Sequence, residues 1–232
     1  MTVLEAIDLT RTFVGGDGGL LTVLDGVSLQ VEQGEMVAVV GASGAGKSTM
    51  LHLLGALDRP TRGRVMIRGA ALDGLDDESL AKLRNQTVGF VFQFHHLLRE
   101  FSALENVTIP LRIAGWDTAK ATRRAADLLE RVGLGGRMTH RPSALSGGEQ
   151  QRTAVARALA VDPAILLADE PSGNLDHANA ERLHDLFEEL SRDLEIAMVI
   201  VTHNRSLASR ADRVLLLEDG KLTETNVGEA VP

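Results

Sequence analysis

The chain has 232 residues and contains no cysteine, which excludes disulfide bonds, thiol catalysis and cysteine-ligated zinc. Its net charge of −8 argues against a general attraction to nucleic acid or acidic lipid. No basic segment followed by an apolar one opens the sequence, and no apolar run approaches the roughly 20 residues that span a bilayer. We therefore expect a cytosolic or peripheral chain that folds as one large α/β domain or as a core with an inserted lobe.

The first 90 residues are predicted to be mostly strands. Residues 27–40 favour two strands with a turn at Gln33–Gly34, and residues 62–69 favour another. Residues 36–40 are apolar on both faces, which is typical of a buried strand in a parallel sheet. Helices are expected at 47–57 and 76–86, and a strand at 88–94.

The middle of the chain changes character. Between residues 94 and 157 the pattern is helical and contains no convincing strand, which predicts an inserted helical lobe. Buried-strand patterns resume at 164–170 and 196–203, separated by an amphipathic helix over 178–192. A hairpin around Asp219–Gly220 is predicted over residues 213–225.

The clearest chemical signal is the G-x-x-x-x-G-K-S pattern over residues 41–48, which lies between a buried strand and the start of a helix. Such a loop wraps backbone N–H groups around a triphosphate, while Lys47 supplies positive charge and Ser48 supplies a hydroxyl to Mg²⁺. A chance glycine-rich turn is the alternative. The strand and helix on either side favour a nucleotide site.

Two adjacent carboxylates, Asp169 and Glu170, end a buried strand at the sheet edge where α/β folds bind ligands. One of them can order a magnesium shell while the other orients or deprotonates water. Helix-capping acids are the alternative. His203 closes the next strand and is positioned to contact a γ-phosphate if that strand joins the same sheet, whereas His177 and His184 are expected on a solvated helix face.

Residues 146–149 predict a second anion site. Ser146 and Glu149 form an S-x-x-E capping box at the start of a helix, and the two glycines between them leave the first backbone N–H groups accessible.

The order of these motifs resembles the ATP-binding subunits of ABC transporters, over about residues 3–220. The sequence "LSGGEQ" at 145–150 is highly specific for that family. The resemblance implies a single domain over 1–232, with a P-loop NTPase (RecA-like) core, an N-terminal antiparallel β subdomain and an inserted α-helical subdomain. The core would comprise 1–93 and 158–232, and the helical subdomain, carrying the signature motif, 94–157.

The resemblance also assigns roles to site residues. Phe13 would stack on adenine, a position commonly held by Tyr, which this chain lacks. Asp169 would coordinate Mg²⁺ through water, Glu170 would be the general base and His203 the γ-phosphate sensor. Gln93 would contact Mg²⁺ and the attacking water, and Ser48 would also bind the metal. The ATP phosphates would be held by Gly41, Ala42, Ser43, Gly44, Ala45, Gly46, Lys47, Ser48 and Thr49.

The family further implies a second copy of the chain. In a head-to-tail dimer, Ser146, Gly147 and Gly148 would face the γ-phosphate of ATP bound by the other copy, and Asp176 would lie at the same interface. In this arrangement the ligand of the anion site at residues 146–149 is the γ-phosphate of the other copy's ATP.

Within the family, residues 83–111 and 140–152 resemble the ATPase of the bacterial lipoprotein-releasing system, in the mechanotransmission branch. Integral membrane transporter subunits are then the expected partners, at the cytoplasmic face of the inner membrane, and no nucleic acid is expected. A macrolide or peptide efflux ATPase of that branch is the alternative, followed by a soluble non-transport ABC ATPase and a regulatory module without turnover. Arg99 departs from the Pro expected there, and Asn204 from the usual Asp.

Overall fold

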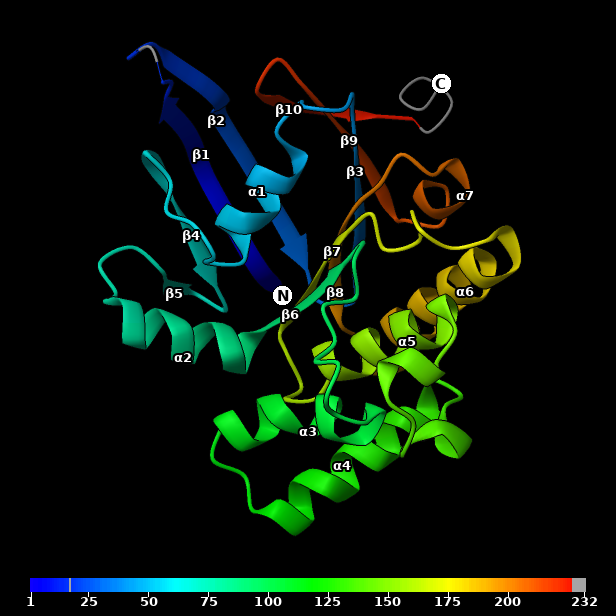
Figure 1. Cartoon of the computed structure of the whole chain (residues 1–232). Helices are drawn as coiled ribbons and strands as arrows, with labels where there is room; N and C mark the ends of the chain where they lie inside the picture. The colour runs from blue at the N-terminus through cyan, green and yellow to red at the C-terminus, as the bar shows by residue number, and fades with distance from the viewer. Residues whose placement is uncertain (17, 227–232) are drawn as a thin grey trace.

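The computed structural model describes residues 1–16 and 18–226. Its N-terminal part is an antiparallel sheet in the order β2-β1-β4-β5 (Figure 1). The long strands β1 (Thr2–Val14) and β2 (Leu20–Glu32) pair along their length, β4 (Arg62–Ile67) pairs with β1, and the short β5 (Ala70–Ala71) pairs with β4. The strands predicted in this region are confirmed.

A second, six-stranded sheet has the order β10-β9-β3-β8-β7-β6. The strands β3 (Met36–Val40), β6 (Val88–Phe92), β7 (Ile165–Asp169), β8 (Ala197–Val201) and β9 (Arg213–Glu218) run parallel, and β10 (Lys221–Thr225) closes the predicted hairpin as an antiparallel edge. The carboxyl ends of the parallel strands therefore meet at one edge of the sheet.

Helices connect the strands. The predicted helices appear as α1 (Lys47–Leu54), α2 (Asp77–Thr87), α5 (Gly147–Ala158) and α6 (His177–Leu194), and the predicted helical middle of the chain also contains α4 (Thr118–Arg131). The sequence did not single out α3 (Ala103–Ile113), the four-residue α7 (Arg205–Ala208) or the 3₁₀ turns at Gly135–Arg137 and Pro142–Ala144. Helix α1 ends three residues before the predicted limit of 57.

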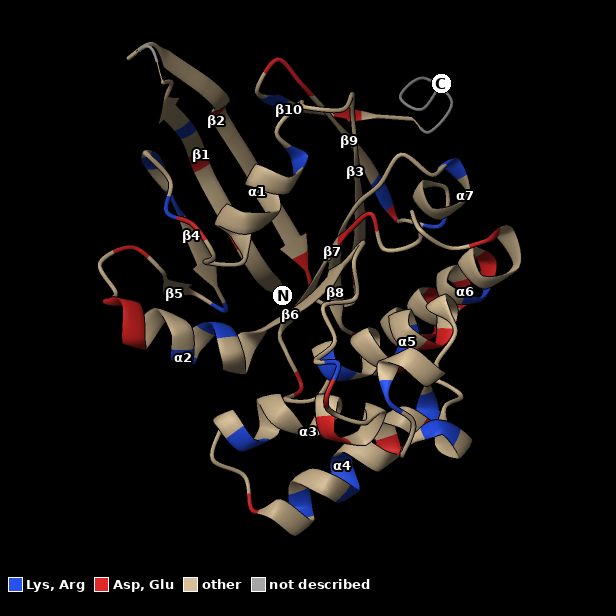
Figure 2. Ribbon diagram, in the orientation of Figure 1, with Lys and Arg blue, Asp and Glu red and all other residues tan. Residues whose placement is uncertain are grey.

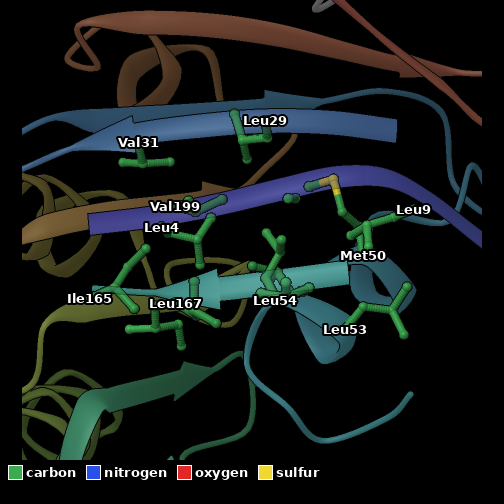
Figure 3. Close-up of a cluster of buried hydrophobic side chains, with 14 of the residues drawn as sticks. Leu4, Leu9, Leu29, Val31, Met50, Leu53, Leu54, Ile165, Leu167 and Val199 are labelled. Atoms are coloured by element: carbon green, nitrogen blue, oxygen red, sulfur yellow. The ribbon is translucent and has the colours of Figure 1, made fainter. Parts of the chain in front are cut away.

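Apolar side chains fill both faces of the six-stranded sheet. In β7, Ile165 and Leu167 pack with α1 and the N-terminal sheet, whereas Leu166 and Ala168 pack against the helices on the other face. This alternation follows from the two-residue period of a strand and explains why the sequence of β7 is apolar throughout. Figure 3 shows the first cluster, with Met50 and Leu54 of α1 among the side chains between the sheets.

Between β6 and β7 the described chain contains only helices, and α3, α4 and α5 pack on one another as a lobe below the sheets (Figure 1). The α/β class, with two sheets and a helical lobe, confirms the predicted fold. Across residues 1–16 and 18–226, no helix combines the length and apolar character needed to cross a bilayer.

Candidate active site

The loop between β3 and α1 is shaped by its glycines. Gly41 has φ +151°, and a Cβ there would lie 2.3 Å from the carbonyl oxygen of Leu217, so the position requires glycine. The Lys47 ammonium donates to the carbonyl oxygens of Gly41, at 2.8 Å, and Ala42, at 2.9 Å. The loop thus folds back around the Lys47 ammonium. The first backbone N–H groups of α1, which have no partner within the helix, are available to a ligand bound in the loop.

The loop and the two acidic residues line one pocket, as the sequence predicted. Figure 2 shows the start of α1 in blue and the end of β7 in red, at the same edge of the sheet. Lys47 and Ser48 line this pocket together with Asp169 and Glu170. The complete lining comprises Val23, Ser43, Gly44, Gly46, Lys47, Ser48, Thr49, Asp169, Glu170 and Val201.

Glu170 is held by the neighbouring strand. Its backbone N–H donates to the Val201 carbonyl at 2.8 Å, and its φ of +45° is rare for a residue with a side chain. Its carboxylate accepts the backbone N–H of His203 at 3.2 Å, and His203 Nδ1 lies 2.8 Å from Oε1. These contacts fix the Glu170 carboxylate beside the pocket that Lys47 lines, which suits a chemical role.

Gln93 lies just beyond β6 and is paired with a residue that the sequence analysis overlooked. Its Nε2 donates to Asn174 Oδ1 at 3.1 Å, and Asn174 Nδ2 donates to the Gln93 carbonyl at 3.1 Å. The side chain therefore rests on the loop that follows Glu170 and is absent from the described lining of the acidic pocket. No local pattern signals this pairing, because 81 residues separate the partners.

Phe13 lies near the end of β1 with 38% of its surface exposed. The guanidinium carbon of Arg11 sits 4.6 Å from the ring centroid, and that same guanidinium is 2.8 Å from Asp58. One face of the ring thus carries a cation that an ion pair holds in place. Its predicted stacking on adenine stays a prediction.

The helix start at Ser146 has the predicted capping box. Ser146 Oγ accepts the N–H of Glu149 at 3.3 Å, and the Glu149 carboxylate accepts the N–H of Ser146 at 2.8 Å. The Ser146 N–H, together with Arg137 at 2.9 Å, lowers the pKa of Glu149 from 4.5 to about 2. Gly147 and Gly148 then begin α5 without side chains in front of their N–H groups.

Asp176 caps the neighbouring helix α6. Its carboxylate accepts the backbone N–H of Asn179 at 2.9 Å and the Asn179 amide at 2.7 Å, and the first of these bonds contributes most to lowering its pKa. Gly148 touches the same amide, since a Cβ there would lie 2.5 Å from Asn179 Oδ1. The structure therefore brings the signature helix and Asp176 together, but neither lines the described pocket of Lys47.

Comparison with known proteins identifies the family. Residues 24–173 match the ABC transporter family. This chain belongs to that family. The cassette is 54% identical to the lipoprotein-releasing system ATP-binding protein LolD of Xanthomonas axonopodis pv. citri, over 96% of this chain and 91% of that protein. It is 51% identical to LolD of Geobacter metallireducens, over 95% of this chain and 98% of that protein.

Solved structures agree with this assignment. A dimeric bacterial ABC transporter cassette superposes on this chain with a TM-score of 0.88 at 38% identity, covering 97% of this cassette and 98% of that chain. A post-hydrolysis dimer of an ATP-binding cassette with bound ADP and Pi has a TM-score of 0.87 at 37% identity, with the same coverage. The cassette is accordingly an ATP hydrolase of the ABC type.

The donors in the pocket suit a magnesium nucleotide. Among the described residues, no three His, Cys, Asp or Glu side chains are grouped to hold a metal ion. The hydroxyl of Ser48 and the carboxylate of Asp169 share the pocket with the Lys47 ammonium. Mg²⁺ typically binds one or two protein oxygens and completes its shell with phosphate and water, so this sparse oxygen set fits Mg·ATP better than a free ion.

Proposed function

We propose that this cassette is the ATP-binding and hydrolysing subunit of a lipoprotein-releasing transporter. The observation that carries the proposal is the 54% identity to LolD proteins over 96% of the chain. Residues 94–157 would form the helical subdomain, which carries the signature motif, and residues 1–93 and 158–232 the nucleotide-binding core. The cassette would lie at the cytoplasmic face of the inner membrane, bound to integral membrane subunits.

The phosphate loop would bind ATP through its backbone N–H groups, with adenine against Phe13. The Lys47 ammonium would exchange its two carbonyl partners for phosphate oxygens, which costs little reorganisation because the side chain is already in place. Ser48, Gln93 and Asp169 would hold Mg²⁺, which neutralises phosphate charge when bound.

Glu170 would act as the general base. Its carboxylate borders the same pocket as Lys47 and accepts two contacts from His203, which fix its orientation. Glu170 would take a proton from the attacking water, while the ring of His203, 72% exposed, faces outward for the γ-phosphate. Gln93 would leave Asn174 to reach that water.

Two copies would complete two sites. Ser146 and Gly147 are exposed at the N-terminus of α5, while Gly148 is buried against Asn179. This terminus is suited to an anion but is absent from the described lining of the chain's own phosphate pocket. A head-to-tail dimer brings this terminus, and Asp176, to the nucleotide of the other copy. Such a dimer is closed by ATP, because each nucleotide contacts both chains, and it loosens after hydrolysis.

The test uses Glu170→Gln. Loss of the base should slow phosphate release by about 10²–10⁴-fold while ATP still binds, and the variant should shift from monomer to dimer on sizing with Mg-ATP. Tagged Glu170→Gln, purified from membranes in mild detergent with Mg-ATP, should retain membrane subunits with a large extracytoplasmic domain and bound lipoprotein.

Other outcomes separate the alternatives. Near wild-type turnover by Glu170→Gln would refute the assignment of the base, and a persistent monomer would count against the shared site. Capture of an efflux adaptor would identify a macrolide or peptide exporter instead. Recovery of ribosomes or DNA in place of membrane proteins would refute the transporter.

A further inference from the structure

His184 of α6 is buried, which corrects the expectation of a solvated position. The ring has no exposed surface and belongs to the buried face of the helix that also carries Ala180 and Phe187, at i−4 and i+3. His177, at the start of the same helix, is exposed as expected. Burial lowers the pKa of His184, so the neutral ring is favoured.

The buried ring contacts the loop that follows Glu170. Its Nε2 lies 3.0 Å from the hydroxyl of Ser172, which is itself 6% exposed and stands two residues after Glu170. Its Nδ1 lies 3.4 Å from Glu181 Oε1 and has no hydrogen-bond partner among the described residues. The carboxylate favours a proton on Nδ1, so Nε2 accepts the hydrogen bond of the Ser172 hydroxyl.

Glu181 extends the contact to the segment after His203. The hydroxyl of Ser206 donates to Glu181 Oε1 at 2.8 Å, and Arg210 lies 2.8 Å from Oε2. Ser206 is in α7, three residues beyond His203, and α7 packs beside α6 (Figure 1). Arg210, two residues past the end of α7, also pairs with Asp185 at 2.6 Å and with Glu188 at 3.3 Å, so the segment after His203 is held to α6 at three carboxylates.

The contacts of α6 connect the segments that follow the two candidate catalytic residues. Glu170 and His203 touch each other directly, and the segments that follow them are both hydrogen-bonded to α6: Ser172 to His184, and Ser206 to Glu181, which lies one turn before His184 on that helix. We propose that His184 and Glu181 are positioning residues. They fix the relative positions of the Glu170 and His203 side chains for hydrolysis without touching the nucleotide. The inference rests on the proposed ATPase function.

Simple space filling is the competing explanation. An apolar side chain would fill the same volume without leaving a buried ring nitrogen unpartnered, which is costly. The two explanations differ in what a substitution does to turnover. Space filling predicts loss of stability alone, whereas positioning predicts a loss of kcat, because misplacement of a reacting group by about 1 Å costs about a hundredfold.

The experiment compares the steady-state ATPase of full-length variants at one protein concentration. His184→Leu keeps the apolar packing but loses both polar contacts, and it should lower kcat about tenfold to a hundredfold with KM for ATP changed less than about twofold. His184→Gln, whose amide can still meet Ser172, should recover most of the loss. Glu188→Gln is the matched control, since it weakens only the outer Arg210 pair, and its kcat should stay at the wild-type value.

Ser172→Ala tests the same proposal if His184→Leu fails to fold. It removes the hydroxyl from the loop side and should lower kcat in the same way. Where His184→Leu does fold, combining the two substitutions should cost little more than either alone. Wild-type kcat in both single variants would overturn the proposal, as would a fall in kcat that Gln does not restore. Absence of ATPase in the wild-type chain would instead refute the proposed function.

Discussion

Two neighbouring glycines at the start of α5 should respond oppositely to the same substitution. A Cβ on Gly147 meets nothing closer than Leu175 Cδ2, at 3.8 Å, and alanine favours the helix by up to about 1 kcal/mol over glycine. A Cβ on Gly148 would lie 2.5 Å from Asn179 Oδ1 and 2.7 Å from its Cγ, which is too close for any real contact. The Asn179 amide must therefore turn away from Asp176.

The magnitude follows from the collision. Forcing an extra carbon into a filled site typically costs about 1–3 kcal/mol, and turning the Asn179 amide also breaks its bond to the exposed Asp176 carboxylate at 2.7 Å. After the gain in helix propensity is subtracted, Gly148→Ala should destabilise the chain by about 1 kcal/mol, and Gly147→Ala should stabilise it by up to about 1 kcal/mol. The two variants should differ by about 2 kcal/mol.

Urea unfolding at neutral pH without nucleotide measures this difference directly. Asn179→Ala provides the control, because it removes the two closest atoms and leaves only the Asn179 Cβ, at 3.1 Å, so Gly148→Ala should cost much less in that background. Equal stability of Gly147→Ala and Gly148→Ala would refute the reasoning. So would an undiminished cost of Gly148→Ala in the Asn179→Ala background.

Two further predictions concern the same loops. Glu149→Gln keeps the capping contact but loses the Arg137 pair, and Glu149→Ala loses both, so they should cost about 0.5 and 1–2 kcal/mol at neutral pH. Because the folded pKa of Glu149 is lowered to about 2, the charge-dependent part of this stability is present above its ordinary value of 4.5 and is lost as pH falls toward 2, so the gap between wild type and Glu149→Ala should shrink there to the gap between Glu149→Gln and Glu149→Ala. Gly41→Ala, which collides with Leu217, should cost about 3 kcal/mol in thermal or urea unfolding and abolish ATP binding, whereas Gly44→Ala, in open space, should cost about 1 kcal/mol. A pH-independent gap for Glu149→Ala, or equal losses at the two glycines, would contradict these expectations.

The sequence was most informative where physical constraints are local. Strands β7 and β8 are apolar on both faces because each is covered on both sides, and that leaves a continuous apolar run in the chain. The phosphate loop is likewise encoded within eight consecutive residues, since its glycines, Lys47 and Ser48 act on one bound group. The acidic pair was located by the strand that it ends.

Contacts between distant segments were not predictable in the same way. The pairing of Gln93 with Asn174 depends on how the loops after β6 and β7 meet, which no periodicity records. Strand β5, with two residues, and helix α7, with four, are too short to show a period. The burial of His184 did leave a signal, because its spacing from Ala180 and Phe187 places it on the apolar face of α6.

The signature helix does not line the phosphate pocket of its own chain, and this has a genetic consequence. In the proposed dimer, each site combines the phosphate loop of one chain with the signature helix of the other. A chain with a defective Lys47 and a chain with a defective Ser146 helix start therefore form one intact site together. That site combines the intact loop of the chain with the helix defect and the intact helix start of the chain with the loop defect. A chain with both defects, paired with wild type, damages both sites at once. Two different lesions in separate copies should therefore complement each other, whereas the same two lesions in one copy should be dominant.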